Sequence, residues 1–107
     1  MKNFPGGMQN FLRQAQQMQN KMGKLQEELA KQTTEASTGG GAVTVVAFGN
    51  QTLSSVKIGK EIMESGDVEM LQDLVLSAAN EALKKAKEMS EAEMQKVTGG
   101  LSIPGLF

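Results

Sequence analysis

A seven-residue repeat of apolar side chains near the N-terminus is the feature that most restricts how this chain can fold. The repeating positions alternate between steps of three and four residues, and they are Met8, Phe11, Ala15, Met18, Met22, Leu25 and Leu29. This spacing predicts an α-helix with one narrow apolar stripe. Because the other faces are rich in Gln, Asn, Lys and Arg, we expect the helix to pack this stripe alone against another helix.

The predicted helix, residues 8–32, is too long for a compact domain of this size. A helix of about 24 residues measures about 36 Å, whereas a compact chain of this length is about 26 Å across. We therefore expect one end to project. The 107 residues suffice for a single domain, and so small and elongated a chain is expected to form an oligomer. The repeat leaves open whether its stripe packs within one chain or across a dimer.

After the helix, the composition becomes that of a small antiparallel sheet. The segments 33–38, 42–48 and 53–58 read as an edge strand, a central apolar strand and a returning strand. Gly39–Gly41 and Gly49-Asn50 are turn signals, because Gly and Asn tolerate a positive φ. Residues 33–58 are therefore predicted to form an antiparallel meander.

A broad, alanine-rich pattern predicts one long or two consecutive C-terminal helices over residues 67–98. Asp67 suits the N-cap, and a wide apolar stripe is typical of a helix lying flat on a sheet. That stripe comprises Val68, Leu71, Leu74, Val75, Ala78, Ala79, Ala82, Leu83 and Ala86. Ser90-Glu91-Ala92-Glu93 reads as a capping box that starts a third helix or continues the second. The predicted class is α+β.

The end of the chain offers apolar residues that could pack on the first helix. Met94, Val97 and Leu101 have a spacing that could meet its stripe. Residues 99–107 form an apolar tail with four large apolar side chains, which we expect to dock on the rest of the protein.

The absence of certain residue types excludes most catalytic chemistry. The chain has no Cys and no His, which removes thiolate catalysis, the commonest general base and the usual zinc ligands. Gly39–Gly41 lacks the Lys that follows in a phosphate-binding loop, and Asp67, Glu69 and Asp73 are explained by the N-terminus of a helix. We therefore expect no enzyme, no cofactor, no metal and no small-molecule substrate. No apolar segment is long enough to span a membrane.

The net charge of −1 conceals a strong separation of charge along the chain. Residues 1–26 carry Lys2, Arg13, Lys21 and Lys24 without an acid, whereas residues 61–81 carry six acids without a base. Cations interleaved with amides suit phosphate groups and the base edges of a duplex. The same pattern also fits a solvated helix face, and the residues alone leave both readings open.

Several motifs resemble those of the YbaB/EbfC family of bacterial nucleoid-associated, DNA-binding proteins. They are the runs at 14–22 (QAQQMQNKM), 39–45 (GGGAVTV), 56–58 (VKI), 67–75 (DVEMLQDLV) and 98–107 (TGGLSIPGLF). The resemblance covers nearly the whole chain and implies a single DNA-binding domain over residues 1–107. It also implies a tweezer-like homodimer that binds double-stranded DNA, compacts it and modulates gene expression in the nucleoid of the cytoplasm.

Carried over residue by residue, the resemblance assigns DNA binding to both helical arms. The candidate residues, with Lys2 added from the charge pattern, are Lys2, Arg13, Gln14, Gln17, Lys21, Lys24, Gln95 and Lys96. One departure is visible, since Gly59-Lys60 stands where the family usually has Asp-Pro. The alternative function is a protein–protein interaction module that uses the apolar repeat and the tail and has no nucleic-acid role.

Overall fold

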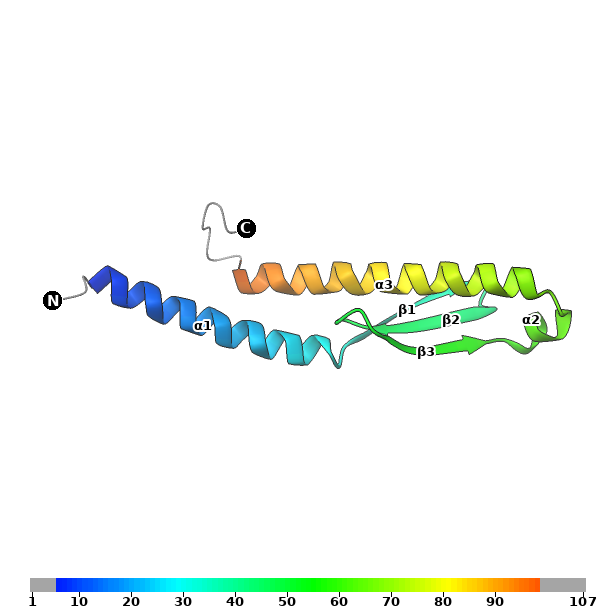
Figure 1. Cartoon of the computed structure of the whole chain (residues 1–107), viewed down its shortest axis with the longest axis horizontal. Coiled ribbons are helices and arrows are strands. Elements are labelled where there is room, and N and C mark those ends of the chain that lie inside the picture. The colour runs from blue at the N-terminus through cyan, green and yellow to red at the C-terminus, as the bar shows by residue number, and fades with distance from the viewer. Residues whose placement is uncertain (1–5, 99–107) are drawn as a thin grey trace.

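The computed structural model describes residues 6–98 as a helix, three strands and two further helices (Figure 1). The elements are α1 (Gly6–Leu29), β1 (Thr33–Thr38), β2 (Val43–Phe48), β3 (Leu53–Ile58), α2 (Lys60–Ser65) and α3 (Val68–Thr98). The predicted α+β class, with a long N-terminal helix, a three-stranded antiparallel sheet and a long C-terminal helix, is confirmed. The predicted tail, residues 99–107, and Lys2 lie outside the described residues.

Two details of the helices differ from the sequence expectations, and a third decides between one long and two consecutive C-terminal helices. The first helix ends at Leu29 rather than at residue 32. The short helix α2 was not expected, and Gly59-Lys60 forms its entry. Ser90 lies inside the uninterrupted α3, so the capping-box sequence does not start a third helix. A six-residue helix is too short to show a periodic pattern, which explains why the sequence did not indicate α2.

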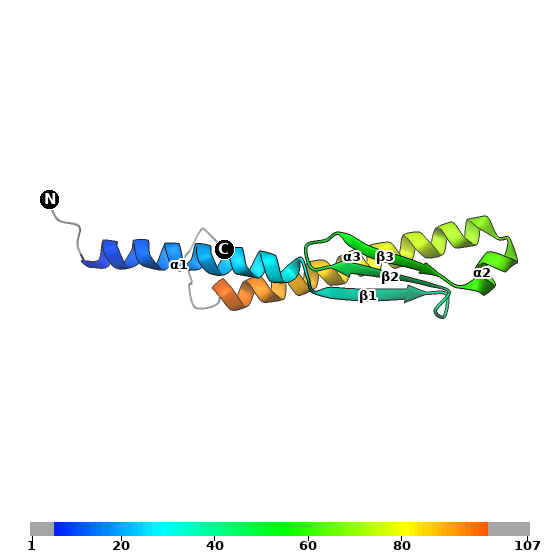
Figure 2. The same ribbon diagram turned by 90° about the horizontal axis from the view of Figure 1, so that it is seen from below.

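The core lies between α3 and one face of the sheet, whose strand order is β1-β2-β3. Figures 1 and 2 show α3 running along the sheet. The core-facing side chains of β2 and the alanines of α3 are fully buried, and they are Val43, Val45, Ala47, Ala78, Ala82 and Ala86. Alanine lets the helix backbone approach the sheet closely, which accounts for the alanine-rich stripe. Val68 is an exception to the predicted stripe, because it is exposed.

Hydrogen bonds fix where α3 begins and how it sits over β1. The Met70 backbone N–H donates to Oδ1 of Asp67 at 3.0 Å, which confirms Asp67 as the N-cap. The Thr38 hydroxyl donates to the carbonyl oxygen of Leu74 at 2.8 Å. The Lys85 ammonium donates to the carbonyl oxygen of Glu35 at 3.1 Å. Both of the latter bonds join α3 to β1, so the helix is held toward that edge of the sheet.

Because α3 lies toward β1, the core-facing side of β3 is left uncovered. Leu53, Val56 and Ile58 pair with Ala47, Val45 and Val43 in the register of the sheet, so they point to the same face. The β2 side chains are fully buried, whereas Leu53, Val56 and Ile58 remain 45%, 44% and 41% exposed. The exposed Leu76 and Val68 of α3 add to the apolar surface of the protomer. We call Leu53, Val56 and Ile58 the open face.

The two glycine-containing turns behave differently. Gly39, Gly40 and Gly41 all have positive φ, as the turn prediction required. The hairpin turn predicted at Gly49-Asn50 joins β2 to β3, but the positive φ in it, 67°, belongs to Gln51. The Asn50 side chain instead accepts hydrogen bonds from the backbone N–H and the hydroxyl of Thr52 at 3.2 and 2.6 Å.

Gly49 is required by close packing against the end of α1. A Cβ atom at this position would lie 2.8 Å from Cδ2 of Leu29 and 2.9 Å from the Leu29 carbonyl oxygen. We expect Gly49→Ala to lower the free energy of unfolding by about 1–3 kcal/mol, because the backbone must shift where the β2–β3 turn contacts the end of α1. Urea denaturation followed by circular dichroism measures this change.

Gly23 provides the matched control, because an added Cβ there meets no atom within 4 Å. It lies inside α1, where glycine costs about 1 kcal/mol relative to alanine. Gly23→Ala is therefore expected to stabilise the protein or leave its unfolding midpoint unchanged. Equal destabilisation by both substitutions would contradict the packing argument for Gly49.

The protomer is strongly elongated. Its principal extents are 76 × 23 × 17 Å and its radius of gyration is 20.9 Å, against about 13 Å for a compact chain of this length. Figure 1 shows why: α1 runs away from the sheet, and its N-terminal half extends beyond the end of α3. The projecting helix expected from the apolar repeat is present.

Candidate nucleic-acid interface

Four of the candidate DNA-binding residues form a stripe along α1. Arg13, Gln17, Lys21 and Lys24 are spaced by four, four and three residues, so they lie on one side of the helix. All four side chains are exposed. Within residues 6–98, Arg13, Lys21 and Lys24 have no acidic side chain within ion-pair distance. We call these four residues the basic stripe.

The C-terminal end of α3 brings a further cation to this stripe. Lys21 and Lys24 of α1 and Lys96 of α3 line one groove of about 260 Å³. Leu25 and Val97 form part of its apolar wall. The packing of α1 against α3 thus gathers three of the candidate residues at one place, although they lie more than 70 positions apart in the sequence.

Two acids also line this groove, and the sequence analysis did not include them. Glu93 forms an ion pair with Lys96 at 3.3 Å, and Glu28 of α1 lines the other wall of the groove. The Lys96 side chain is largely exposed, and exposed ion pairs contribute about 0–1 kcal/mol. A phosphate can therefore compete for Lys96. The position of Glu28 could have been predicted from the sequence, because it lies four residues after Lys24 and therefore on the same side of α1 as the basic stripe.

The remaining candidates are not gathered in the groove. Arg13 lies about 12 Å further along α1 from Lys21, at eight residues of 1.5 Å each. Gln14 and Gln95 are exposed on α1 and α3, and neither lines the groove.

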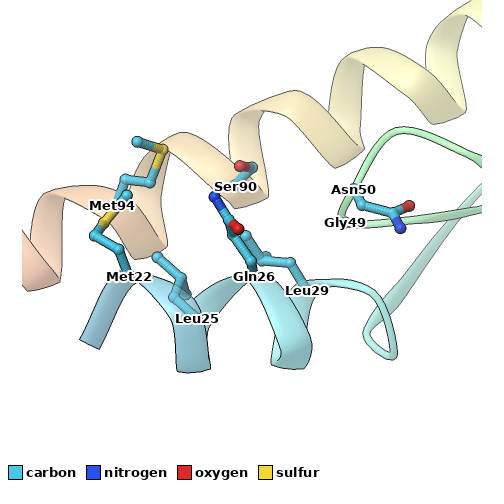
Figure 3. Close-up of a pocket in the computed structure, with 8 residues that line it drawn as sticks. All are labelled: Met22, Leu25, Gln26, Leu29, Gly49, Asn50, Ser90 and Met94. Atoms are coloured by element: carbon cyan, nitrogen blue, oxygen red, sulfur yellow. The ribbon is translucent and has the colours of Figure 1, made fainter. Parts of the chain in front are cut away.

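The joint between the two helices is apolar. Leu25 and Leu29 of α1 are buried, and they line a cavity of about 380 Å³ together with Met22, Met94 and the β2–β3 turn. Figure 3 shows Met22 and Met94 pointing toward one another from α1 and α3. The C-terminal half of the apolar repeat therefore packs against α3 of the same chain. For this half, the choice between packing within one chain and packing across a dimer is settled. This joint holds the basic stripe beside the end of α3.

Six of the twelve acids of the chain lie at the other end of the molecule. The acidic segment 61–81 comprises most of α2 and the first half of α3, and Figure 1 shows both at the end opposite the N-terminal half of α1. The separation of charge along the sequence thus becomes a separation along the longest axis. A polyanion is attracted to one end and repelled from the other.

Other kinds of site find no support in the described part of the chain. Across residues 6–98, no three Asp or Glu side chains are grouped so that they could hold a metal ion. Nor does any helix in that range combine the length and the apolar character that a membrane crossing requires.

Comparison with known proteins places this architecture in a defined class. The chain is 56% identical over 105 residues to a nucleoid-associated protein of Acetivibrio thermocellus, covering 97% of this chain and 93% of the relative. It is 53% identical over 106 residues to a nucleoid-associated protein of Thermoanaerobacter pseudethanolicus, covering 97% and 96%. The fold matches the crystal structure of an uncharacterized protein from Helicobacter pylori with a TM-score of 0.69 and 23% identity, covering 84% and 92%.

The α+β fold with a projecting basic helix, and the relationship to these proteins over nearly the full length, place the chain in the class of nucleoid-associated proteins. The YbaB/EbfC DNA-binding family model matches residues 4–101. The chain belongs to this family.

Proposed function

We propose that this protein is a homodimer that binds double-stranded DNA mainly through phosphate contacts, compacts it and modulates gene expression in the nucleoid. The observation that carries this proposal is the basic stripe on α1, continued by Lys96 across the groove. Lys and Arg neutralise phosphates without reading sequence, and the neighbouring amides donate hydrogen bonds to phosphate oxygens or base edges. Affinity of this origin requires no catalytic group.

The open face supports the homodimer. Three large apolar side chains of β3 lie on the uncovered side of the core, and exposed apolar surface of this kind marks protein–protein contacts. Burying the open face against its copy in a two-fold dimer would complete the sheet–helix core. The dimer would then carry two basic stripes, on two projecting arms.

Double-stranded DNA fits such arms better than a single strand does. The described aromatic side chains are Phe11 and Phe48, which lie on different elements and cannot form a stacking platform. The stripe is instead a straight row of cations on a helix, which suits the regular phosphates of a duplex.

A salt titration tests this mechanism. If each protomer uses three or four cations, the dimer makes about six to eight phosphate contacts, and the logarithm of the affinity should fall with the logarithm of the salt concentration with a slope of about −5 to −7. Fluorescence anisotropy with duplexes of unrelated sequence measures the slope, and similar slopes are expected for all of them.

Two results would count against the proposal. Tight binding with a slope near zero would show that phosphate contacts are not the source of affinity. No duplex binding at low salt, together with a protein partner that survives nuclease treatment, would favour the interaction-module alternative.

A further inference from the structure

The N-terminal half of α1 carries an apolar surface that nothing in the described protomer covers. Met8, Phe11 and Leu12 are 44%, 55% and 54% exposed, and Ala15 between them and the joint is exposed as well. We call these four residues the tip stripe. It continues the apolar repeat whose other end, Leu25 and Leu29, is buried at the joint with α3.

The N-terminal half of the α1 repeat is exposed because α3 ends before it reaches that half. Val97 lines the groove beside Lys21 and Leu25, so the last described residues of α3 lie level with the middle of α1. Figure 1 shows the same arrangement, with α1 continuing past the end of α3. The last described turn of α3 therefore lies about 9 Å along α1 from Ala15, where the tip stripe begins.

The nine residues after Thr98 have the length and the chemistry to cover this surface. Gly99-Gly100-Leu101-Ser102-Ile103-Pro104-Gly105-Leu106-Phe107 carries four large apolar side chains and no charged side chain. Nine extended residues span about 30 Å, whereas Lys21, which lies beside Val97, is about 20 Å from Met8 along the helix. Two consecutive glycines allow the chain to leave the axis of α3, and Pro104 opposes a further helix.

We propose that residues 99–107 pack as a strap along the tip stripe of α1 in the same chain. The strap extends the α1–α3 contact beyond the end of α3 and removes apolar surface from water along the arm. The tip stripe and the basic stripe lie on opposite sides of α1, because their centres are separated by about half a turn at 3.6 residues per turn. The strap therefore leaves Arg13, Gln17, Lys21 and Lys24 open to DNA. This proposal does not depend on DNA binding.

Disulfide trapping tests the strap, since the chain contains no Cys. In the full-length protein, the pair Phe11→Cys and Leu106→Cys should form an intrachain disulfide under mild oxidation at least 10-fold faster than the pair Gln9→Cys and Leu106→Cys. Gln9 is the matched control, because it lies only about 3 Å from Phe11 along the helix axis and on the opposite side of α1. Non-reducing electrophoresis separates intrachain products from covalent dimers.

Equal rates for the two pairs would overturn the proposal. Covalent dimers in place of intrachain products would also overturn it, since they would show that the tip stripe is occupied by a second copy.

Hydrogen exchange supplies a second measurement that needs no new cysteine. Ending the chain after Gly100 should speed exchange of the amides of residues 8–15 several-fold and leave those of β2 unchanged. Ser102→Asp, a polar change in the same segment, should keep most of the protection. Unchanged exchange on truncation would contradict the strap.

Discussion

Replacing Arg13, Lys21 and Lys24 together with Ala is expected to weaken duplex binding by at least about 10³-fold at 0.1 M salt. The three side chains are exposed, lie on one side of α1 and have no acidic partner within residues 6–98. A dimer loses six phosphate contacts, so the salt slope should become shallower by about 5. Because the lost contacts carry no sequence information, duplexes of different sequence should be affected about equally.

A variant with the same change in charge provides the control. Lys57, Lys60 and Lys84 are exposed and lie on β3, α2 and the middle of α3, away from the basic stripe. Replacing these three with Ala should change affinity much less than the α1 triple variant does. Equal losses for the two variants would show that net charge, and not the arm, determines binding. Selective loss on one DNA sequence would indicate base readout.

A Val56→Lys substitution is expected to raise the dissociation constant of the homodimer by at least about 100-fold. Val56 is at the centre of β3 on the open face and is 44% exposed in the protomer, so the protomer can accept the longer side chain. In a two-fold interface, each substitution appears twice, and each buries an ammonium group without a partner. Sedimentation velocity should show a shift from twice the 11.4 kDa chain mass toward the monomer.

Ser55→Lys is the matched control, because Ser55 is the neighbouring residue of β3 and points to the opposite face of the sheet. It adds the same charge and should leave the dimer intact. Far-ultraviolet circular dichroism checks that both variants remain folded. If Val56→Lys remains fully dimeric at nanomolar concentration, the open face is not the dimer interface.

The long elements of the fold could be predicted from the sequence because each has a complete periodic or capping signal. The apolar repeat determined α1, the β-branched run determined β2, and Asp67 marked the start of α3. The short helix α2 and the backbone conformation of the β2–β3 turn were not predicted. The six residues of α2 are fewer than two helical turns, and Gln51 takes the positive φ in a turn where Gly49 is instead needed for its lack of a side chain.

The candidate interface could be predicted only one helix at a time. Spacing along α1 is sufficient to align Arg13, Lys21 and Lys24, because a helix fixes which residues share a side. The meeting of Lys96 with this row depends on how α3 packs on α1 and on where α3 ends, which no local pattern encodes. The same packing brings Glu28 and Glu93 into the groove, and their presence could not be inferred from the charge of separate segments.

The apolar joint at Leu25 and Leu29 holds α1 at its C-terminal end, beside the sheet, so a change in the angle of α1 would pivot about this end. A swing of about 10° around Leu29 moves Arg13, about 24 Å away along the helix, by about 4 Å, and it moves Lys24 by only about 1 Å. The rise between successive phosphates of one DNA strand is about 3.4 Å. A small change of angle at this joint would therefore shift Arg13 relative to Lys24 by about 3 Å, close to one phosphate step, while the sheet and its alanine-packed helix stay as they are.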